Sequence, residues 1–487
     1  MPDCPSAFVR FNTGHGLDPV VTDTTTGSLR AAFAGEKARF QALFFVHYAA
    51  FSGFAVFRNV YLEEMGMSGS AMGQIGFLMT ATGVAVQPLW GVLSDYLRAE
   101  RPILILGAVA SALALLAYPA AEGLTAPFLL VAVGTAVYSA ARAPIVPITN
   151  GLVLSRGYDY GSIRAFGSIA FGIGSLGFGF LVAALGTASI VYFYVGGTAV
   201  FVAIVLSVSE SPAEGGDADD ANGEADPTVD GEADPTVDGE AEPTVDGEAD
   251  PTVDGDAEPT TDGGEPDRSE SDTDGTDPSL REAVRTLVTN VDFLVVLVIG
   301  FLVGFALRGG SAYFSVYMRA VEASMVVGPW SLSPDAVTGL SWAIKTAFEA
   351  AAFVYAVRLS WSYRTFLLFG GVAVAVPNVV YGLTGQPWAI IAVQSASGLG
   401  YGLYYVAIVN LVYVVASDRV TSTAQTVLTG AGLGFGGAVG QVAGGELMDL
   451  VGIQEMYLYP AVVGFVGAAV ALFVRQDGSI GDEKRAV

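Results

Sequence analysis

Lys345 and Glu349 stand four residues apart inside a long, mostly apolar stretch of this chain. On a helix this spacing places both side chains on one face, where an ammonium and a carboxylate can pair. A charge at the middle of a bilayer costs at least about 2.5 kcal/mol, so it survives where it faces a cavity or a partner. Arg308, between Leu307 and a Gly-Gly pair, could also pair with Glu349 and would leave one positive charge for an anionic substrate group. The pair is therefore either purely structural or part of a binding site for a polar solute.

Arg142 and Arg164 add two more cations in apolar stretches of the N-terminal half, with no acidic residue beside them in those stretches. Such an excess of cations favours an anionic or strongly hydrogen-bonding substrate, such as a carboxylate, a phosphate or a sugar acid. Two alternatives stay open: Arg164 could reach the cytoplasmic surface, and Arg142 could bind carbonyl groups that Pro144 and Pro147 leave free.

Two residues are candidates for ion coupling. Glu349 is the only acid that we place deep in the membrane, so it is the first candidate. His47 is the second, because an imidazole titrates near neutral pH, although a lone histidine can equally serve as a hydrogen-bond donor between helices. The coupling ion is expected to be a proton or sodium.

The composition is that of a membrane protein. Of its 487 residues, 52% are hydrophobic and only 14% are charged, against roughly 25% charge in soluble domains. The chain holds one cysteine, Cys4, and two histidines, and it lacks phosphate-loop, dinucleotide-binding and zinc-ligand patterns. We therefore expect no enzyme activity, catalytic residues, metal, cofactor or nucleic-acid partner.

The hydropathy layout predicts an all-α polytopic membrane protein with twelve transmembrane helices in two six-helix bundles, because a span needs roughly 20 mostly apolar residues. We expect a tail over 1–38, a first bundle over 39–208, a linker over 209–285, a second bundle over 286–475 and a tail over 476–487. The helices are expected near 40–60, 72–94, 102–121, 126–148, 163–186, 188–208, 290–317, 335–358, 364–384, 387–413, 422–447 and 455–475.

The linker carries almost all of the net charge. Residues 210–280 contain 26 acidic residues and one basic residue, or −25 of the total −26. An eight-residue unit, GEADPTVD, repeats from residue 223 with small variations. Gly, Pro and like charges at this density cannot bury a core, so we expect a disordered tether. Acid-rich sequence with only three lysines also suggests a halophilic host.

Arg and Lys in the short loops fix the expected orientation. With a cytoplasmic N-terminus, nearly all loop cations fall on the inner side, and only Arg58 and Arg319 fall near the outer side. Both termini and the linker are thus expected to be cytoplasmic, in a multi-pass protein of the cell membrane that works as a monomer. The two halves also contain an internal sequence repeat, because residues 76–107 match residues 339–370. This match favours two parallel repeats around a central cavity.

The loop after the second predicted helix reads Gly91-Val-Leu-Ser-Asp95-Tyr-Leu-Arg98-Ala-Glu-Arg101. This segment resembles the loop signature of the major facilitator superfamily, with alanine at position 99 in place of a usual glycine. The resemblance implies that these residues form a cytoplasmic gate between the halves.

A narrower resemblance covers most of the membrane-embedded chain. The segments 44–118, 160–169 and 423–449 are similar to the branch that contains lactose permease and nucleoside–proton symporters. In that branch an arginine on the fifth helix and a glutamate on the eighth contact substrate, and these positions fall on Arg164 and Glu349. The permease's proton-coupling residues on its tenth helix fall near Ser397 and Gly400, so we do not expect galactoside transport or the permease's coupling route.

These observations predict a secondary active transporter that moves a small polar solute, such as a sugar, nucleoside or organic acid, by alternating access with ion coupling. Substrate-binding candidates are Arg164, Glu349, Arg142, Arg308 and Lys345. An exporter of drugs or metabolites is the alternative within transport, and a non-transporting membrane sensor is a further one.

Overall fold

The computed structural model describes residues 35–97, 99–158, 160–208, 285, 289–416 and 421–475. The expectations for the acidic repeats and for the two tails therefore lie outside the described residues, as does Arg98. The described helices belong to one compact unit.

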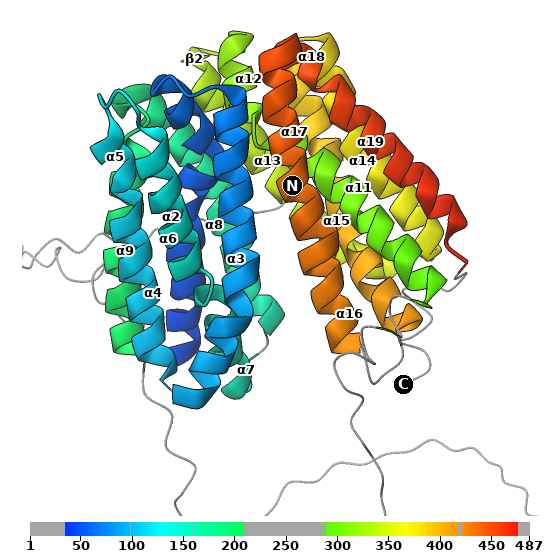
Figure 1. Cartoon of the computed structure of the whole chain (residues 1–487), viewed down its shortest axis with the longest axis horizontal. Helices are drawn as coiled ribbons and strands as arrows, with labels where there is room; N and C mark the ends of the chain where they lie inside the picture. The colour runs from blue at the N-terminus through cyan, green and yellow to red at the C-terminus, as the bar shows by residue number, and fades with distance from the viewer. Residues whose placement is uncertain are drawn as a thin grey trace, which may run out of the picture. The chain divides into compact units, whose positions relative to one another are not determined.

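The first bundle forms the blue-to-green half of Figure 1. Its fourth rod breaks at Pro144, because proline cannot continue an i→i−4 hydrogen-bond ladder. The elements are α2 (Glu36–Glu64), α3 (Gly69–Leu97), α4 (Glu100–Leu115), α5 (Ala117–Ala121), α6 (Phe128–Arg142), α7 (Ile145–Ser155), α8 (Tyr160–Leu185) and α9 (Ser189–Ser207).

The second bundle forms the other half of the same unit (Figure 1). A π-helical turn, η2 (Leu428–Gly434), interrupts its fifth rod where glycines are frequent. The other elements are α11 (Val291–Ser311), α12 (Phe314–Ala320), α13 (Pro334–Tyr355), η1 (Ala356–Arg358), α14 (Tyr363–Leu383), α15 (Pro387–Val415), α16 (Thr421–Val427), α17 (Phe435–Val451), α18 (Ile453–Met456), α19 (Leu458–Val470) and η3 (Ala471–Phe473).

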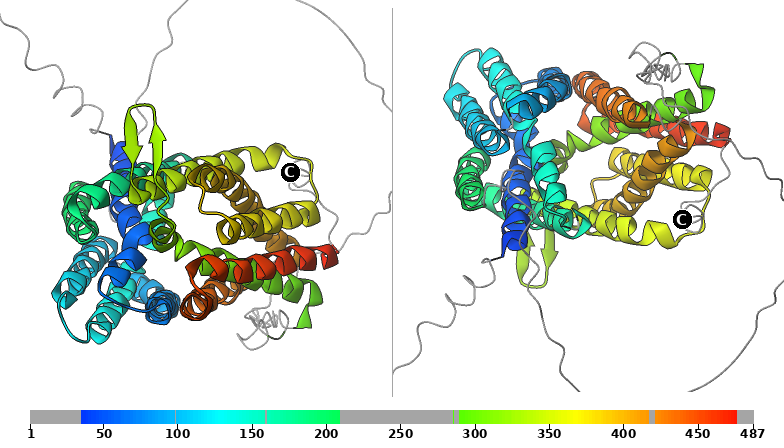
Figure 2. Two further views of the ribbon diagram at one scale, coloured as in Figure 1. Left: turned by 90° about the horizontal axis from the view of Figure 1, so that it is seen from above. Right: turned by 90° about the horizontal axis from the view of Figure 1, so that it is seen from below.

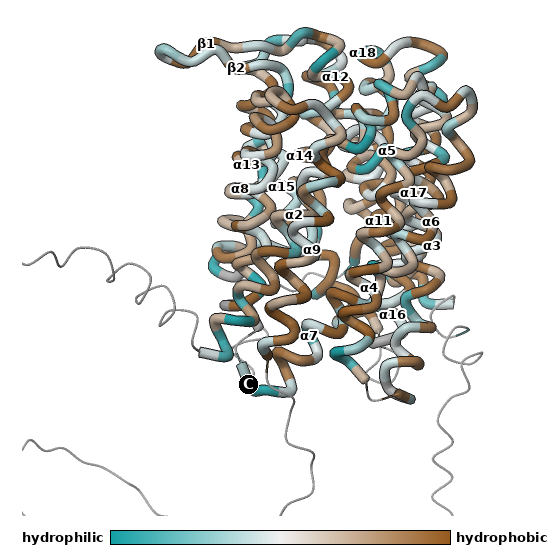
Figure 3. Tube along the Cα trace, turned by 90° about the vertical axis from the view of Figure 1, so that its left-hand side faces the viewer, coloured by the Kyte–Doolittle hydropathy of each residue, from teal (hydrophilic) through white to brown (hydrophobic). Residues whose placement is uncertain are grey.

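The predicted all-α class is confirmed. Within the described residues, ten helical rods are long and apolar enough to cross a membrane. The two other predicted spans are also helical: α13, which carries Asp335, Lys345 and Glu349, and the interrupted rod α16–η2–α17. Apolar residues run along most of each rod (Figure 3), as lipid contact requires.

A small β-hairpin between α12 and α13 was not predicted. Strands β1 (Met325–Val327) and β2 (Trp330–Leu332) pair antiparallel, with Val327 opposite Trp330. The two-residue turn needs a positive φ, which Gly328 supplies at 59°. Figure 2 shows the hairpin projecting from the bundles.

Two seams join the bundles: α3 packs against α17, and α8 packs against α13. Glycine permits close approach at both. A Cβ on Gly76 would lie 2.3 Å from Gln441 Oε1, and one on Gly339 would lie 2.4 Å from the Ser175 carbonyl oxygen. Positions 76 and 339 are equivalent in the sequence repeat, so the repeat places equivalent helices at the two seams.

The buried apolar core shows where the bundles join. One cluster contains residues of both bundles, including Phe57, Tyr61, Tyr317 and Tyr381, around α12 and the loop after α2. Two further clusters, around Phe366 and Phe40, draw on one bundle each. The halves therefore share a core at one end, which we name the closed end, and keep separate cores at the other end, where α7 and α16 lie (Figure 1).

Candidate functional site: charged groups at the bundle seam

Hydrogen bonds cross between the bundles at the closed end. Asp449 of α17 accepts from the backbone N–H groups of Gly69, at 2.7 Å, and Ser70, at 2.8 Å. A carboxylate at these first N–H groups of α3 caps the helix and interacts favourably with its dipole. Asn59 Nδ2 also donates to the Ala312 carbonyl at 2.8 Å. These hydrogen bonds join the two bundles at the closed end.

An ion-paired group reinforces the closure. Arg319, at the end of α12, pairs with both carboxylate oxygens of Asp335 at 2.7 and 2.9 Å and with Glu64 of the first bundle at 2.5 Å. A two-point guanidinium–carboxylate contact fixes orientation as well as charge. Arg319 thus connects α12 and α13 to the end of α2.

Arg164 and Glu349, the two predicted substrate contacts, lie on the paired helices α8 and α13. Both side chains are half-buried. The Arg164 guanidinium lies 4.6 Å from the ring centre of Tyr48 and attracts the Glu349 carboxylate through space. The structure therefore brings an N-bundle cation and a C-bundle anion to the same seam.

Lys345 lies on the face of α13 that carries Glu349, as the spacing predicts. Its side chain is 6% exposed, and its Nζ stands 4.6 Å from the ring centre of Trp342. Glu349 attracts the ammonium, but within the described residues Lys345 and Glu349 form no direct ion pair. Neither charge is neutralised by close contact.

Arg308 lies near the end of α11, and its stem packs against Gly437, whose Cβ position would be 2.7 Å from Arg308 Cγ. The side chain is exposed, yet its charge acts on Lys345 of its own bundle and on Arg58 of the other. Within the described residues it forms no ion pair with Glu349. Arg308 thus presents a positive charge between the bundles.

His47 and Arg142 form a second group inside the first bundle. Arg142 Nη2 lies 3.3 Å from His47 Nε2, and the guanidinium stands 3.8 Å from the centre of the Phe51 ring. His47 is 8% exposed. Arg142, considered above as a partner for carbonyl groups freed by prolines, has the histidine as its hydrogen-bond partner among the described residues. Arg142 Nε is buried without a partner there.

Arg58 is a buried cation that the sequence reasoning placed near the outer surface. It is 6% exposed, donates to Asn59 Oδ1 at 3.0 Å and lies 3.4 Å from Gln441 Oε1 of the other bundle. Gln441 in turn donates to Thr80 at 3.3 Å. The sequence shows this arginine inside an apolar run, and we predicted that the span ends close to it.

The predicted cytoplasmic gate is only partly described. Gly91 lies on the exposed part of α3, the side chain of Asp95 lies outside the description, and Arg101 donates to the Leu206 carbonyl at the end of α9. Arg364, the repeat equivalent of Arg101, donates to the carbonyl of Val474 at 2.7 Å. Each arginine thus contacts the C-terminal residues of its own bundle.

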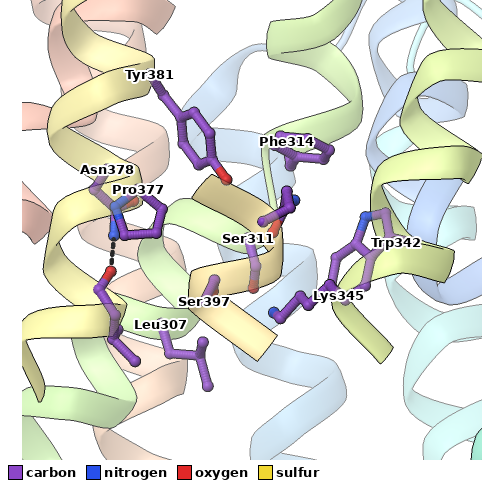
Figure 4. A pocket seen from close by; sticks show the side chains of 11 residues that line it. Leu307, Ser311, Phe314, Trp342, Lys345, Pro377, Asn378, Tyr381 and Ser397 are labelled. Carbon is purple, nitrogen blue, oxygen red and sulfur yellow. Dashed lines mark hydrogen bonds between the residues drawn. The ribbon is translucent and has the colours of Figure 1, made fainter. Parts of the chain in front are cut away.

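A small cavity of about 20 Å³ lies among helices of the second bundle (Figure 4). Lys345 points into it, and Arg164 and Glu349 are not among its lining residues. Lys345 is a predicted binding residue; the other polar residues of the cavity were not predicted to bind substrate, since none of them is charged. The lining includes Trp342, Gln394, Ser311, Ser397 and Tyr381.

Two packed helical bundles, related by a sequence repeat and carrying charges at their seam, are the architecture of many membrane transporters. The model of the MFS_1-like family matches residues 38–459, and the chain belongs to this family. It is a multi-pass membrane protein and a secondary transporter of the major facilitator type, not an enzyme.

Relatives and solved structures agree with this family. The chain is 24% identical to a maltose permease of Geobacillus stearothermophilus over 93% of its length and 98% of the permease. It is 23% identical to an uncharacterized transporter, YwbF, of Bacillus subtilis, over 88% of this chain and 93% of that one.

Solved structures share the fold at low sequence identity. The nucleoside transporter NupG matches with a TM-score of 0.66 at 13% identity, over 90% of this chain and 99% of that one. A POT family transporter in complex with 5-aminolevulinic acid matches with a TM-score of 0.60 at 11% identity, over 90% of this chain and 95% of that one.

Proposed function

We propose that this transporter moves a small polar solute, such as a sugar, nucleoside or organic acid, by ion-coupled alternating access. The observation that carries the proposal is that Arg164 and Glu349 lie on the paired helices α8 and α13, where the guanidinium attracts the carboxylate through space. Each residue comes from a different bundle. Rocking of the bundles would therefore move the two residues relative to each other and change how they bind a solute. Arg308 and Lys345 add positive charge from the second bundle, and Arg142 adds it from the first.

One-ended closure supports alternating access. Asp449, Asn59 and Arg319 connect the bundles at the closed end, whereas the cores at the other end are separate. With cytoplasmic termini, as the loop charges predict, the closed end faces outward and the site is reached from the cytoplasm. The Asp95 loop would then close the cytoplasmic side in the opposite state.

Glu349 is the first candidate for ion coupling. It is the acidic residue placed farthest from both ends of its helix among the described residues, and cations of both bundles act on it. A proton or sodium ion on Glu349 would remove its attraction for Arg164 and Lys345 and leave both cations to bind substrate. His47, held by Arg142, is the second candidate.

Uptake into proteoliposomes tests the proposal. Sugars, nucleosides and organic acids are offered in turn, while pH and sodium gradients are imposed separately and in both directions. This design also distinguishes an importer from an exporter. Absence of gradient-dependent flux for every solute, in protein shown to be folded, contradicts transport by this route and favours a sensor.

Two variants test the site. We expect Arg164→Lys to reduce uptake strongly, because lysine cannot form the two-point contacts of a guanidinium. We expect Glu349→Gln to abolish gradient-driven accumulation while exchange continues. Matched controls are Arg364→Lys, whose guanidinium donates to the Val474 carbonyl of its own bundle, and Glu446→Gln, an exposed carboxylate on α17. If the site variants behave like their controls, the site assignment is wrong.

A further inference from the structure

The β-hairpin at the closed end carries an exposed apolar surface that the proposed substrate site does not use. Strands β1 and β2 contain Val326, Val327 and Trp330, which are 70%, 41% and 70% exposed. The sequence from residue 323 to residue 334 holds no charged side chain. Contiguous apolar surface of this kind commonly marks a site of interaction with another protein or with a membrane.

One face of the hairpin is entirely apolar. Side chains alternate between the two faces of a strand, and residues directly opposite each other on paired strands share a face. The other face carries Val326 and Ser331, which are opposite each other. The two register pairs on the apolar face are Met325–Leu332 and Val327–Trp330.

The apolar face continues from the protein core past the edge of the bundles. Met325 and Leu332, at the base of the hairpin, are 5% and 9% exposed and belong to the core cluster of the closed end. Val327 and Trp330, near the turn, are exposed on the same face. The tip therefore turns its apolar side in the direction in which the base meets the helices.

The position of the hairpin selects lipid as the partner. The hairpin lies where the helical rods end and projects sideways from them (Figure 3). Rods of this length and hydropathy end at the boundary between the hydrocarbon core of a bilayer and water. Beyond the edge of the bundles, the bilayer lies alongside the rods. The apolar face of the hairpin is directed to that side, so it is continuous with the lipid-facing surface.

The residue types agree with this partner. Tryptophan is enriched at membrane–water interfaces, because its ring is apolar and its indole N–H can hydrogen-bond there. Val327 adds apolar area beside the Trp330 ring, since the two residues are opposite each other. The nearest charged residues, Glu322 and Asp335, flank the base of the hairpin, where Asp335 pairs with Arg319.

We propose that the tip of this hairpin docks onto the bilayer, with Val327 and Trp330 inserted among the lipid headgroups of the leaflet at the closed end. The inference goes beyond the proposed function and needs no assumption about the substrate. The hairpin joins α12 to α13. Docking therefore attaches the start of α13, the helix that carries Lys345 and Glu349, to the membrane interface.

Spin labels on two adjacent valines test the docking. Cys4→Ser removes the single cysteine, and Val327→Cys or Val326→Cys then places a nitroxide on the apolar face or on the opposite face. The full-length proteins are reconstituted into phosphatidylcholine vesicles. Collisions of the nitroxide with oxygen, which concentrates in lipid, are compared with collisions with a water-soluble nickel chelate. We expect the ratio of oxygen to nickel collisions to be severalfold higher at position 327 than at position 326.

A second substitution tests the role of the indole ring. Trp330→Ser should raise nickel collisions of the label at position 327 severalfold, because removal of a large apolar side chain weakens burial at the interface. Ser331→Ala, on the opposite face, is the matched control and should leave this label unchanged. Vesicles that contain anionic phosphatidylglycerol should give the same ratios, because the docked face carries no charge that attracts anionic lipid.

The proposal is overturned if both labels collide mainly with nickel, or if Trp330→Ser leaves the label at position 327 unchanged. An equal effect of Ser331→Ala, or ratios that depend on lipid charge, would also contradict insertion of the apolar face. Loss of protection at position 327 when the protein is diluted in the vesicles would assign this face to a second copy of the chain instead.

Discussion

Asp449 offers a direct test of how the closed end is held. Its two carboxylate oxygens accept from two N–H groups of α3 at 2.7 and 2.8 Å. Asp449→Asn keeps the size and one acceptor but removes the charge and the second acceptor. Glu446→Gln is the matched control, since Glu446 is an exposed acid on the same helix with no hydrogen bond among the described residues.

The expected magnitude follows from these contacts. A hydrogen bond to a charged group contributes roughly 1.5–3 kcal/mol, and the charge at a helix N-terminus adds about 0.3–1 kcal/mol. Asparagine retains part of this, so we expect the closed arrangement to lose about 1.5 kcal/mol relative to the open one. That is roughly a tenfold rise in the population open at this end.

Thiol labelling measures that population. The chain has a single cysteine, so Cys4→Ser provides a clean background. Ser175→Cys then places a thiol on α8 beside Gly339 of α13, where the native side chain is 0% exposed. If opening and closing are fast relative to labelling, the rate of reaction with N-ethylmaleimide tracks the open population.

We expect roughly tenfold faster labelling in Asp449→Asn and an unchanged rate in Glu446→Gln. Equal rates in Asp449→Asn and the parent would show that the cap does not hold this end. An equal acceleration in Glu446→Gln would show that the effect comes from net charge and not from the two hydrogen bonds.

Three further perturbations have defined outcomes. Gly398→Val should lower the melting temperature sharply, because a Cβ there would lie 2.0 Å from the Lys345 carbonyl oxygen and overpacking costs about 1–3 kcal/mol or more; Gly177→Val, where no atom lies within 4 Å of the Cβ position, should have a much smaller effect. Asn290→Ala should cost about 1 kcal/mol in unfolding experiments, because its side chain accepts from two backbone N–H groups at the start of α11. Deletion of 216–275 should leave the initial rate of uptake unchanged if the acidic repeats act as a tether, and loss of uptake would assign them a regulatory role.

Part of the site followed from the sequence because it depends on one helix only. The four-residue spacing of Lys345 and Glu349 places both on one face of α13, and the structure agrees. The other groups depend on which helices become neighbours. His47 and Arg142 are 95 residues apart in the chain, and Arg58 and Gln441 are 383 apart, so no local pattern indicates that they meet.

The sequence by itself determined the helical membrane class, the helical spans and the two-bundle division. The physical reason is that a bilayer requires each span to satisfy its own backbone hydrogen bonds, so the length and polarity of each apolar run fix its structure locally. Only the tertiary structure decided that Asp449 caps α3, that Arg319 connects the bundles and that Lys345 faces an uncharged polar cavity. These features arise from packing between distant helices, where the direction of a side chain depends on its neighbours and not on its own segment.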